Sequence, residues 1–343
     1  MKFKIAQLAA PLLSTPPKGY GGTERVVSML TEELVRRGHQ VTLYATRDSR
    51  TRADLKFLYR KAVGINNYKP IIMLTQAARA FDDADDFDVI HNHEAEYGIT
   101  LSRFVRTPVL TTLHNDYLNP RRRKMEFGFF KDSCYYAFIS RNQHQRLRGL
   151  KYGGVVYNAT DTARYRLKEE KKDYFLFLGN VYRHKGPHIA IRVAKRLGTK
   201  IYITGKYDKG KQEKWFEKYI RPQIDGKRII FHGILSFRKK LELYQNAKAL
   251  LFPIQWEEPF GLVMIEAMAC GTPVVAYNRG SVPEIVKHGE TGFIANTYDE
   301  FLKYSKRVDE IEPKACRRWV EKKFSIRAMT DGYEKVYKKI IKG

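Results

Sequence analysis

The sequence predicts an α/β protein with two similar domains, each built from a parallel sheet and the helices that cover it. Short apolar runs alternate with longer amphipathic stretches, a pattern typical of strands joined by helical crossovers. The alternation stops in the polar, charged stretch 161–173 and then starts again. Because 343 residues exceed what one compact core usually holds, we expect a first domain over 1–160 and a second over 161–327.

The first half contains several apolar runs that predict strands. These runs are Phe3–Leu8, Val41–Tyr44, Val89–His91, Val109–Leu113, Tyr136–Ile139 and Val155–Val156. Between the first two, residues Glu24–Arg37 repeat apolar side chains at helical spacing, which predicts an amphipathic helix. Gly38 follows, where a glycine commonly ends a helix.

The second half repeats this architecture. Its predicted strands are Tyr174–Leu178, Lys200–Thr204, Ile229–Phe231, Ala249–Phe252 and Val274–Ala276. Its predicted helices are Pro187–Leu197, Lys211–Tyr219, Phe237–Asn246, Phe260–Ala269 and Val282–His288. Ser281 and Glu284 have the spacing of a capping box, in which the serine caps the helix and the glutamate reaches back.

Composition limits the classes of function. Lys and Arg outnumber Asp and Glu by 63 to 37, which gives a formal charge of +26, and the excess is spread over both halves. Such a charge attracts phosphorylated substrates, anionic lipid or nucleic acid, or is simply a solvated basic surface. Cys134, Cys270 and Cys316 form no zinc or disulfide pattern, and no apolar run could span a membrane. We therefore expect a cytoplasmic protein.

The strongest functional signal is the segment Glu258-Pro-Phe-Gly-Leu-Val-Met-Ile-Glu266. Pro259 suits the first turn of a helix, and Gly261 lets the backbone approach a ligand closely. The N–H groups and the positive dipole end of such a helix attract phosphate. One carboxylate at the helix mouth and another two turns inside can hold two different polyols. The segment therefore predicts a phosphate site flanked by two polyol-binding carboxylates.

This motif and several others resemble the GT-B glycosyltransferases, specifically the retaining family four. The further blocks are Gly21-Gly22-Thr-Glu24-Arg25, Asp88-Val-Ile-His91-Asn-His93, Leu113-His114-Asn115-Asp116, Gly179-Asn-Val-Tyr-Arg-His-Lys185-Gly186, and Gly280-Ser-Val-Pro-Glu284 with Gly289-Glu-Thr-Gly292-Phe293. They extend over nearly the whole chain. The resemblance implies two Rossmann-like domains facing each other across a cleft, with a C-terminal helix, 328–343, that crosses back to the first domain.

The resemblance implies donor-binding roles in the second domain. Glu258 would bind hydroxyl groups of the donor sugar, and Glu266 would bind the ribose of the nucleotide. The backbone N–H groups of Phe260, Gly261 and Leu262 would hold the pyrophosphate or the sugar.

Lys185 lies where the family places a lysine on the donor phosphates. A cation there stabilises the charge that develops on the leaving diphosphate. The arginine that the family usually has after Gly179 is replaced here by Asn180. Arg183 is the natural substitute, because a guanidinium group binds phosphate through two hydrogen bonds. The alternative interpretation is that Lys185 and Arg183 are surface cations that precede a helix.

Histidines follow two strands of the first domain. His114 comes at the carboxyl edge of the predicted sheet, where ligands of open α/β sheets bind, and the resemblance places it against the transferred sugar. We expect one of His91 and His93 to be packed in the core and the other to face the cleft. His93 and Glu94 are the candidates for contact with the acceptor.

Two further motifs bear on phosphate and metal. Gly21 and Gly22 precede the first helix, where a flexible backbone can approach the donor diphosphate. They are not the Gly-x-Gly-x-x-Gly fingerprint of dinucleotide enzymes. Asp82–Asp88 contains an Asp-x-Asp spacing, but it precedes a strand, and we interpret it as a solvated loop. We expect neither a metal nor a cofactor.

The basic run Arg121–Lys124 precedes Phe127, Phe129 and Phe130. Cations beside aromatic rings can dock on anionic lipid head groups at the inner membrane face, or can hold an anionic acceptor. A mobile charged loop is the alternative interpretation.

These observations lead to one hypothesis, a metal-independent, retaining hexosyltransferase. It would move a sugar from a nucleoside diphosphate, by resemblance uridine diphosphate, to an acceptor hydroxyl, through the front-face substitution that the family implies. One alternative is a sugar-nucleotide epimerase of the same fold. Another is a basic nucleic-acid-binding protein, which would leave the Glu258–Glu266 segment unexplained. The sequence does not determine the acceptor, the linkage or the oligomeric state.

Overall fold

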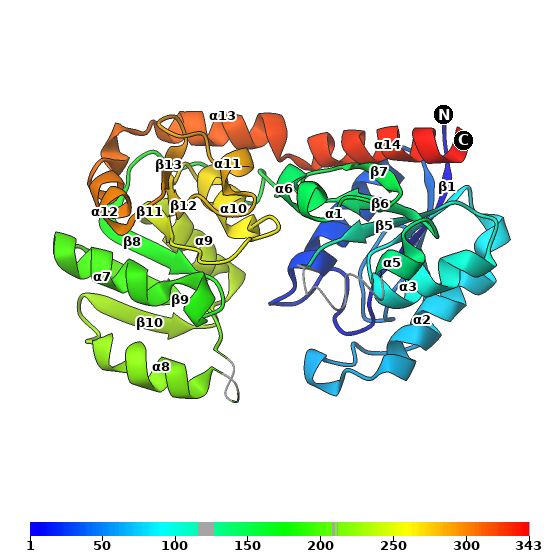
Figure 1. Ribbon diagram of the computed structural model, residues 1–343, viewed down its shortest axis with the longest axis horizontal. Helices are drawn as coiled ribbons and strands as arrows, with labels where there is room; N and C mark the ends of the chain where they lie inside the picture. The colour runs from blue at the N-terminus through cyan, green and yellow to red at the C-terminus, as the bar shows by residue number, and fades with distance from the viewer. Residues whose placement is uncertain (116–126, 208–209, 211, 343) are drawn as a thin grey trace. The chain divides into compact units, whose positions relative to one another are not determined.

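The computed structural model describes residues 1–115, 127–207, 210 and 212–342, so the basic run Arg121–Lys124 lies outside the described residues. The chain forms two compact units (Figure 1). The first comprises Met1–Ala159 and Ile326–Gly343, and the second comprises Thr160–Ser325. Each unit is an α/β domain with its own parallel sheet, as the alternation of apolar and amphipathic stretches predicts.

The sheet of the first unit has seven strands among the described residues, in the order β3-β2-β1-β4-β5-β6-β7, and every pair is parallel. The strands are β1 (Lys4–Leu8), β2 (Gln40–Tyr44), β3 (Asp54–Lys56), β4 (Val89–Asn92), β5 (Val109–Leu113), β6 (Tyr135–Phe138) and β7 (Tyr152–Val155). Because the order reverses between β1 and β4, the loops that follow these two strands lie where open sheets bind ligands.

Helices cover the sheet of the first unit. They are α1 (Gly22–Arg36), α2 (Pro70–Asp82), α3 (Glu96–Leu101), α5 (Gly128–Phe130), α6 (Arg141–Arg146) and α14 (Ile326–Lys342), with short 3₁₀ turns η1 (Ile65–Asn67), η2 (Ala84–Asp86) and η3 (Ser102–Phe104). The last helix, α14, packs against α1 and β7 (Figure 1). The contact is close, because a Cβ atom on Gly154 would lie 2.7 Å from the Val336 side chain.

The sheet of the second unit has the order β10-β9-β8-β11-β12-β13 and is also parallel. Its strands are β8 (Lys172–Leu178), β9 (Lys200–Thr204), β10 (Ile229–Gly233), β11 (Ala247–Phe252), β12 (Val274–Tyr277) and β13 (Gly292–Ala295). Its helices are α7 (Pro187–Leu197), α8 (Glu213–Tyr219), α9 (Phe237–Asn246), α10 (Leu262–Ala269), α11 (Val282–Ile285), α12 (Tyr298–Lys306) and α13 (Pro313–Lys323), with 3₁₀ turns η5 (Arg183–Lys185), η6 (Arg221–Gln223) and η7 (Val308–Glu310). Here the strand order reverses between β8 and β11.

Two glycines let the loops after β8 and β9 pass each other. Gly205 has φ +145°, and a Cβ atom there would lie 1.7 Å from the carbonyl oxygen of Gly179. Gly179 itself has φ +151°. No residue with a side chain fits at Gly205, so the close approach of these loops at the carboxyl edge depends on it.

Several expectations about local structure were wrong. The strands β3 and β13 and the helices α2, α3, α5, α6, α12 and α13 were not predicted. Ser281 does not cap α11 with its side chain. Its hydroxyl instead donates to the carbonyl of Phe260 at 2.7 Å, so the serine joins two loops. Pro259 is not in the first turn of a helix, because α10 begins at Leu262.

The acidic segment before β4 also differs from the expectation of a solvated loop. It does lie at the amino end of the strand, and Asp88 accepts a hydrogen bond from the Lys4 N–H. Asp83, however, accepts from the Tyr44 hydroxyl at 2.6 Å and from Lys56 and Arg79, each at 2.7 Å. These bonds hold the pKa of Asp83 below its usual range even though burial opposes the shift. The residue is therefore a structural anchor.

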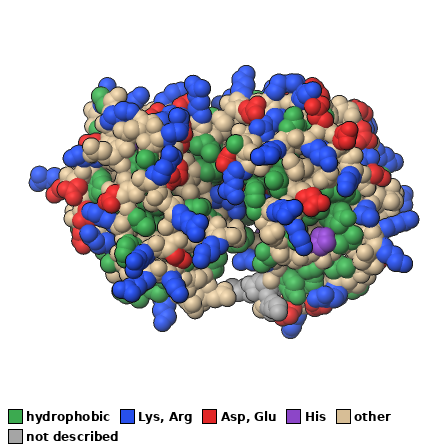
Figure 2. All heavy atoms as spheres, turned by 180° about the vertical axis from the view of Figure 1, so that it is seen from behind, with side chains coloured by type: hydrophobic (Ala, Val, Ile, Leu, Met, Phe, Trp, Pro, Cys, Tyr) green, Lys and Arg blue, Asp and Glu red, His purple; other side chains and the backbone are tan. Residues whose placement is uncertain are grey.

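Basic side chains are spread over the face of the molecule in Figure 2, in agreement with the even distribution of charge in the sequence. None of the helices in the described part of the chain is both long enough and apolar enough to cross a membrane. The three cysteines are free and buried, where burial raises the pKa of each thiol.

Candidate active site

The loops after β8 and β11, the two strands at the reversal of the second sheet, are joined to each other. Lys185, at the end of the first loop, forms an ion pair with Glu258 in the second. The backbone N–H of Gln255 donates to the carbonyl of His184 at 2.8 Å. Gly186 packs against the backbone so closely that a Cβ atom would lie 2.1 Å from the Pro253 oxygen. The predicted lysine and the first predicted glutamate therefore share one position at the carboxyl edge.

Trp256, which the sequence analysis did not single out, completes this contact. Its indole Nε1–H donates to the Glu258 carboxylate at 3.0 Å, and the Lys185 ammonium lies 4.7 Å from the centre of its ring. The His184 ring meets the indole edge to face, at 5.4 Å between centroids. The tryptophan thus positions both charged groups. Nothing in the spacing of the motif signals this role, because it depends on how two loops fold together.

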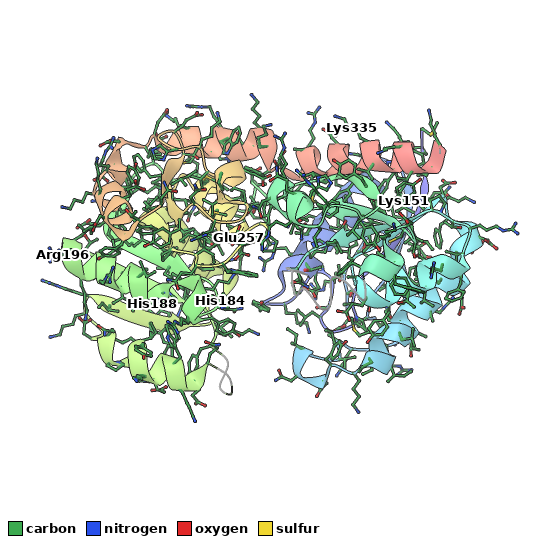
Figure 3. All side chains as sticks on the ribbon, in the orientation of Figure 1. Lys151, His184, His188, Arg196, Glu257 and Lys335 are labelled. Carbon is green, nitrogen blue, oxygen red and sulfur yellow. The ribbon has the colours of Figure 1, made fainter. Side chains whose placement is uncertain are left out.

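A third loop, after β12, holds the Glu258 segment in place through hydrogen bonds. Gly280 donates from its N–H to the Glu257 carboxylate at 2.9 Å, and Ser281 donates from its N–H to the Glu258 carbonyl at 2.9 Å. Figure 3 labels Glu257 and His184, which come from the two loops joined at Lys185. A Cβ atom on Gly280 would lie 2.4 Å from the Glu258 nitrogen, so a larger residue would displace the loop after β12.

The start of α10 offers backbone donors beside this carboxylate. Gly261 is the N-terminal cap residue, in a left-handed conformation, and no side chain caps the first turn. A Cβ atom on Gly261 would approach the Glu258 Cγ to 3.4 Å and the Met264 side chain to 2.8 Å. The N-terminus of α10, with Phe260, Gly261 and Leu262, therefore suits an anion as the motif predicts. Arg183 lies exposed in η5, next to this edge in sequence.

Glu266 has different partners from Glu258. It lies within α10, and its carboxylate accepts from Lys240 Nζ at 3.0 Å and from the Tyr244 hydroxyl at 2.9 Å. Glu266 and Tyr244 are buried, and Lys240 also donates to the Tyr165 hydroxyl at 3.0 Å. Lys240 and Tyr244 are four residues apart on α9, a spacing that places both on one helix face. The sequence pattern alone does not predict this pair.

A surface pocket of about 570 Å³ opens at the carboxyl ends of β11, β12 and β13. Its polar lining includes Gln255, Asn278, Arg279, Asn296 and Tyr298. It continues the edge that carries the Lys185–Glu258 pair, because Gln255 precedes Glu258 in the same loop.

In the first unit, His114 begins a chain of buried hydrogen bonds. His114 Nε2 lies 2.9 Å from His93 Nδ1, and His93 Nε2 lies 2.7 Å from Gln7 Oε1. Gln7 donates from its amide nitrogen to the Tyr337 hydroxyl at 3.2 Å, and that hydroxyl lies 2.6 Å from His91 Nδ1. The chain thus runs from a strand end through the sheet to α14.

The orientation of the Gln7 amide determines where His114 carries its proton. A carbonyl oxygen can only accept, so His93 donates from Nε2. Neutral His93 then accepts at Nδ1, and His114 donates from Nε2. The Nδ1 atom of His114 is left unprotonated, as an acceptor. The tautomer of the predicted sugar-facing histidine is therefore assigned by a residue of β1 and a residue of α14.

Both histidines of the Asp88–His93 block are buried, with His91 0% and His93 5% exposed. The second ring nitrogen of His91, Nε2, lies 2.7 Å from the hydroxyl oxygen of Thr112. Both ring nitrogens of His93 are bonded within the unit. The polar network of the sheet thus includes both rings, which the sequence pattern alone does not reveal.

Glu94 lies in a strained turn after β4. Ala95 has φ +69°, the only positive value for a residue other than glycine within the described ranges. The Glu94 N–H donates to the side-chain oxygen of Asn92 at 3.1 Å, and one carboxylate oxygen accepts from the Gly98 N–H at 3.3 Å. Burial raises the pKa of Glu94 to about 8, so the carboxyl group is largely protonated at neutral pH.

The Gly21–Gly22 pair lies where expected, at the start of α1. Gly21 has φ +146°, and a Cβ atom there would lie 2.8 Å from Pro17 and 2.9 Å from the Glu24 carboxylate. Gly22 is the first residue of the helix. Burial raises the pKa of Glu24 in the first turn.

We expect the stability of the first unit to fall in acid. Burial lowers the pKa of His91, His93 and His114, the last to about 4. A depressed folded-state pKa means that the unfolded chain binds more protons than the folded one. The stability that depends on neutral histidines is therefore fully present above about pH 6.5 and is lost as the pH falls through 4. Urea midpoints measured from pH 7.5 to 4 should decrease, and the decrease should be smaller in His114→Asn. Parallel curves for the two proteins would contradict this assignment.

We also expect Tyr337 to control the tautomer of His114. Tyr337→Phe removes the hydroxyl that orients the Gln7 amide, so a second, Nδ1-protonated form of His114 should appear in long-range ¹H–¹⁵N correlation spectra at neutral pH. The native protein should show the Nε2-protonated form alone. Tyr333→Phe is the matched control, because its hydroxyl contacts only the Thr112 end of the network, at 3.1 Å. An unchanged His114 spectrum in Tyr337→Phe would disprove the coupling.

The structure also bears on whether the described side chains could hold a metal ion. Across the part of the chain that the structure describes, no three His, Cys, Asp or Glu side chains are grouped so that they could hold a metal ion. The Asp-x-Asp spacing near β4 accordingly does not form such a group.

Two Rossmann-like domains, one with a cation and a carboxylate beside a helix N-terminus at its carboxyl edge, have the architecture of the GT-B glycosyltransferases. A family model described as "Glycosyl transferases group 1" matches residues 160–325, and one described as "Glycosyltransferase Family 4" matches residues 20–164. The chain belongs to the group 1 glycosyltransferases with the GT-B fold, of the family four type.

Curated relatives and solved structures agree with this membership. A putative glycosyltransferase, YtcC of Bacillus subtilis, is 26% identical over 264 residues, which are 66% of this chain and 64% of the relative. Glycogen synthase of Mycobacterium tuberculosis is 29% identical over 233 residues, 60% of this chain and 55% of the relative. The matches thus span less than two thirds of the length of these relatives.

The solved structures that resemble the chain cover nearly all of it. AviGT4, a glycosyltransferase involved in avilamycin A biosynthesis, is 24% identical with a TM-score of 0.75 and covers 99% of this chain and 98% of its own. Sucrose-phosphate synthase from Thermosynechococcus elongatus is 20% identical with a TM-score of 0.80 and covers 99% of both chains. At these identities the likeness shows the fold.

Proposed function

We propose that the chain is a retaining glycosyltransferase that moves a hexosyl unit from a nucleoside-diphosphate sugar to an acceptor hydroxyl. The observation that carries the proposal is the contact between Lys185 and Glu258. It brings a cation and a carboxylate together where the strand order of the second sheet reverses, beside the uncapped start of α10.

In this proposal Lys185 and Glu258 bind different parts of the donor. Lys185, with Arg183 and the N–H groups at Phe260, Gly261 and Leu262, holds the diphosphate and stabilises the charge that grows on it as the glycosidic bond breaks. Glu258 accepts hydrogen bonds from hydroxyls of the transferred sugar. Glu266 binds the ribose while remaining anchored by α9. These groups supply the positive charge without a metal.

The first unit supplies the acceptor side. We place His114 against the transferred sugar, where its unprotonated Nδ1 accepts a hydrogen bond from a hydroxyl. Gly21 and Gly22 approach the diphosphate from the start of α1. Glu94, with a protonated carboxyl group, and His93 lie on the loop that contacts the acceptor. The acceptor attacks from the same face that the diphosphate leaves, and the leaving phosphate takes the acceptor proton, so the anomeric configuration is retained.

A uridine diphosphate sugar is the donor that we propose. Support comes from HepE of Anabaena, whose structure in complex with UDP-glucose has a TM-score of 0.75 to this chain at 18% identity. The catalytic domain of starch synthase IV from Arabidopsis thaliana, which was solved with ADP and acarbose, has a TM-score of 0.74 at 15% identity. An adenosine donor is therefore the comparison that any binding experiment should include.

A thermal-shift screen tests this proposal. A panel of uridine, adenosine and guanosine diphosphate sugars is added with and without chelator, and we expect the uridine donor to raise the melting temperature equally in both conditions. Lys185→Ala should abolish that shift. Product analysis then separates transfer, which yields nucleoside diphosphate and a glycoside, from epimerisation, which yields an epimerised nucleotide sugar. Failure of every donor to shift the native protein would contradict the proposal.

We also propose a cytoplasmic location with peripheral contact to an anionic membrane through Arg121–Lys124. The cationic run and the aromatic residues that follow it support this contact. Anionic vesicles should retain the protein, and they should retain a charge-neutralised Arg121–Lys124 variant less well.

A further inference from the structure

Exposed apolar side chains gather in one short part of the first unit. Six large hydrophobic residues between positions 57 and 74 are exposed, and they are Phe57, Leu58, Ile65, Tyr68, Ile71 and Leu74. Four of them, from Ile65 to Leu74, are spaced three residues apart through η1 and the start of α2. Ile71 is 63% exposed and Tyr68 47%. We call these six residues the 57–74 surface. Single exposed hydrophobic residues are ordinary, but a group of this kind marks an interaction site.

The start of α2 carries two of these six residues, Ile71 and Leu74, and exposes both of them. The buried side of α2 is mostly apolar, but it also includes Gln76, which is 1% exposed and has no hydrogen-bond partner for either side-chain atom. Its solvent side includes Ile71 and Leu74. A surface helix normally buries its apolar residues and exposes its polar ones. The exposed start of α2, with Ile71 and Leu74, therefore suits an apolar environment better than water, whereas its exposed end carries the polar Asp82.

The charged residues within this stretch of the chain have a single sign. No acidic residue occurs between Asp54 and Asp82, whereas this stretch contains Lys56, Arg60, Lys61, Lys69 and Arg79. Lys56 and Arg79 are bonded to Asp83, but Arg60, Lys61 and Lys69 are exposed. One carboxylate from outside the stretch, that of Asp48, accepts from the Ala62 N–H at 3.1 Å. Exposed apolar and aromatic side chains next to three exposed cations match the interface of an anionic bilayer, where acyl chains lie beneath negatively charged head groups.

The surface is held in place by the body of the unit. The N–H groups of Val63 and Gly64 donate to the carbonyls of Pro11 and Leu12, at 3.0 and 2.9 Å. The hydroxyl of Tyr68 lies 3.3 Å from that of Tyr97 on α3. A backbone that is already fixed loses little further conformational freedom on docking, so a preformed surface favours binding.

We propose that the 57–74 surface docks the first unit onto an anionic lipid bilayer. Ile65, Tyr68, Ile71 and Leu74 enter the boundary between head groups and acyl chains, and Arg60, Lys61 and Lys69 contact the phosphates. The inference names a surface for the membrane contact proposed above, and it depends on no property of the donor site.

Vesicle sedimentation tests the surface. The native protein should bind vesicles of phosphatidylcholine with phosphatidylglycerol and should bind pure phosphatidylcholine much more weakly. Ile71→Glu combined with Leu74→Glu should lower the partition onto anionic vesicles at least tenfold. The control is Phe104→Glu, which changes a residue that is 80% exposed elsewhere in the same unit. The proposal is overturned if the native protein stays in solution, if the double variant binds normally, or if the control loses binding equally.

A labelled cysteine distinguishes insertion from attraction by charge alone. Because Cys134, Cys270 and Cys316 are buried, Ile71→Cys offers one accessible thiol for an environment-sensitive fluorophore. Its emission should shift to the blue with anionic vesicles, and the same label in Phe104→Cys should not shift. Sedimentation without a blue shift at position 71 assigns the contact to another basic region, such as Arg121–Lys124, and refutes insertion here.

The membrane test and the donor test fail independently. The double variant should keep the native thermal shift with a sugar nucleotide, because no residue of the 57–74 surface belongs to the donor site. A variant that loses both vesicle binding and the donor shift has lost its fold, and the single variants Ile71→Ser and Lys61→Glu then replace it. Each should lower vesicle binding, and unchanged binding in both would refute the proposal.

Discussion

Glu258→Ala should lower transfer by about 10²–10³-fold while the second unit remains folded, a magnitude typical of losing one preorganised polar group at a reacting centre. The carboxylate is held by Lys185 and by the Trp256 indole, so its removal takes away the group that orients the sugar without opening the core. The measurement is kcat/KM for sugar transfer, together with circular dichroism.

The same variant separates the roles of the two paired residues. Without Glu258, Lys185 still faces the diphosphate, so the thermal shift with free nucleoside diphosphate should persist. Lys185→Ala should abolish that shift. Glu310→Ala, which removes only a surface ion pair with Arg307, is the control and should transfer at the native rate. A folded Glu258→Ala enzyme with near-native turnover would refute the assignment of the site.

Glu266→Ala should destabilise the second unit by about 3–5 kcal/mol, the cost expected when one partner of a buried ion pair is removed. The change leaves the Lys240 ammonium and the Tyr244 hydroxyl without the carboxylate that accepts from both. Burial, together with Coulomb repulsion between Glu266 and a tyrosinate, raises the pKa of Tyr244 well above its usual value and keeps it protonated. Urea unfolding of the native and variant proteins measures the difference.

Two further variants show whether the loss of stability comes from the Lys240 charge that Glu266→Ala leaves without its partner. Glu266→Gln combined with Lys240→Met removes both charges and should recover part of the lost stability. Tyr244→Phe should cost about 1–3 kcal/mol, because one buried hydrogen bond is lost. If Glu266→Ala unfolds within about 0.5 kcal/mol of the native protein, a value typical of exposed surface sites, the residue is not the anchor that its contacts indicate.

Local pattern was enough to predict most of the architecture. The strands Val109–Leu113 and Lys200–Thr204 and the helices Pro187–Leu197 and Phe237–Asn246 have the predicted bounds. Apolar periodicity predicts them because strands and helices bury one face at a fixed repeat. The same reasoning missed α2, because Ile71 and Leu74 lie on its exposed side and Gln76 on its buried side, which blurs the apolar periodicity.

The sequence by itself determined the α/β class, the two-domain organisation and the Lys185 and Glu258 motifs, because these depend on residue types at short spacing. Only the tertiary structure decided the partners: Trp256 for Glu258, Lys240 and Tyr244 for Glu266, and the bonds from His114 through Gln7 to Tyr337. Gln7 and Tyr337 are 330 positions apart. Such contacts depend on the order in which strands and helices pack, and no local repeat of side chains encodes that order.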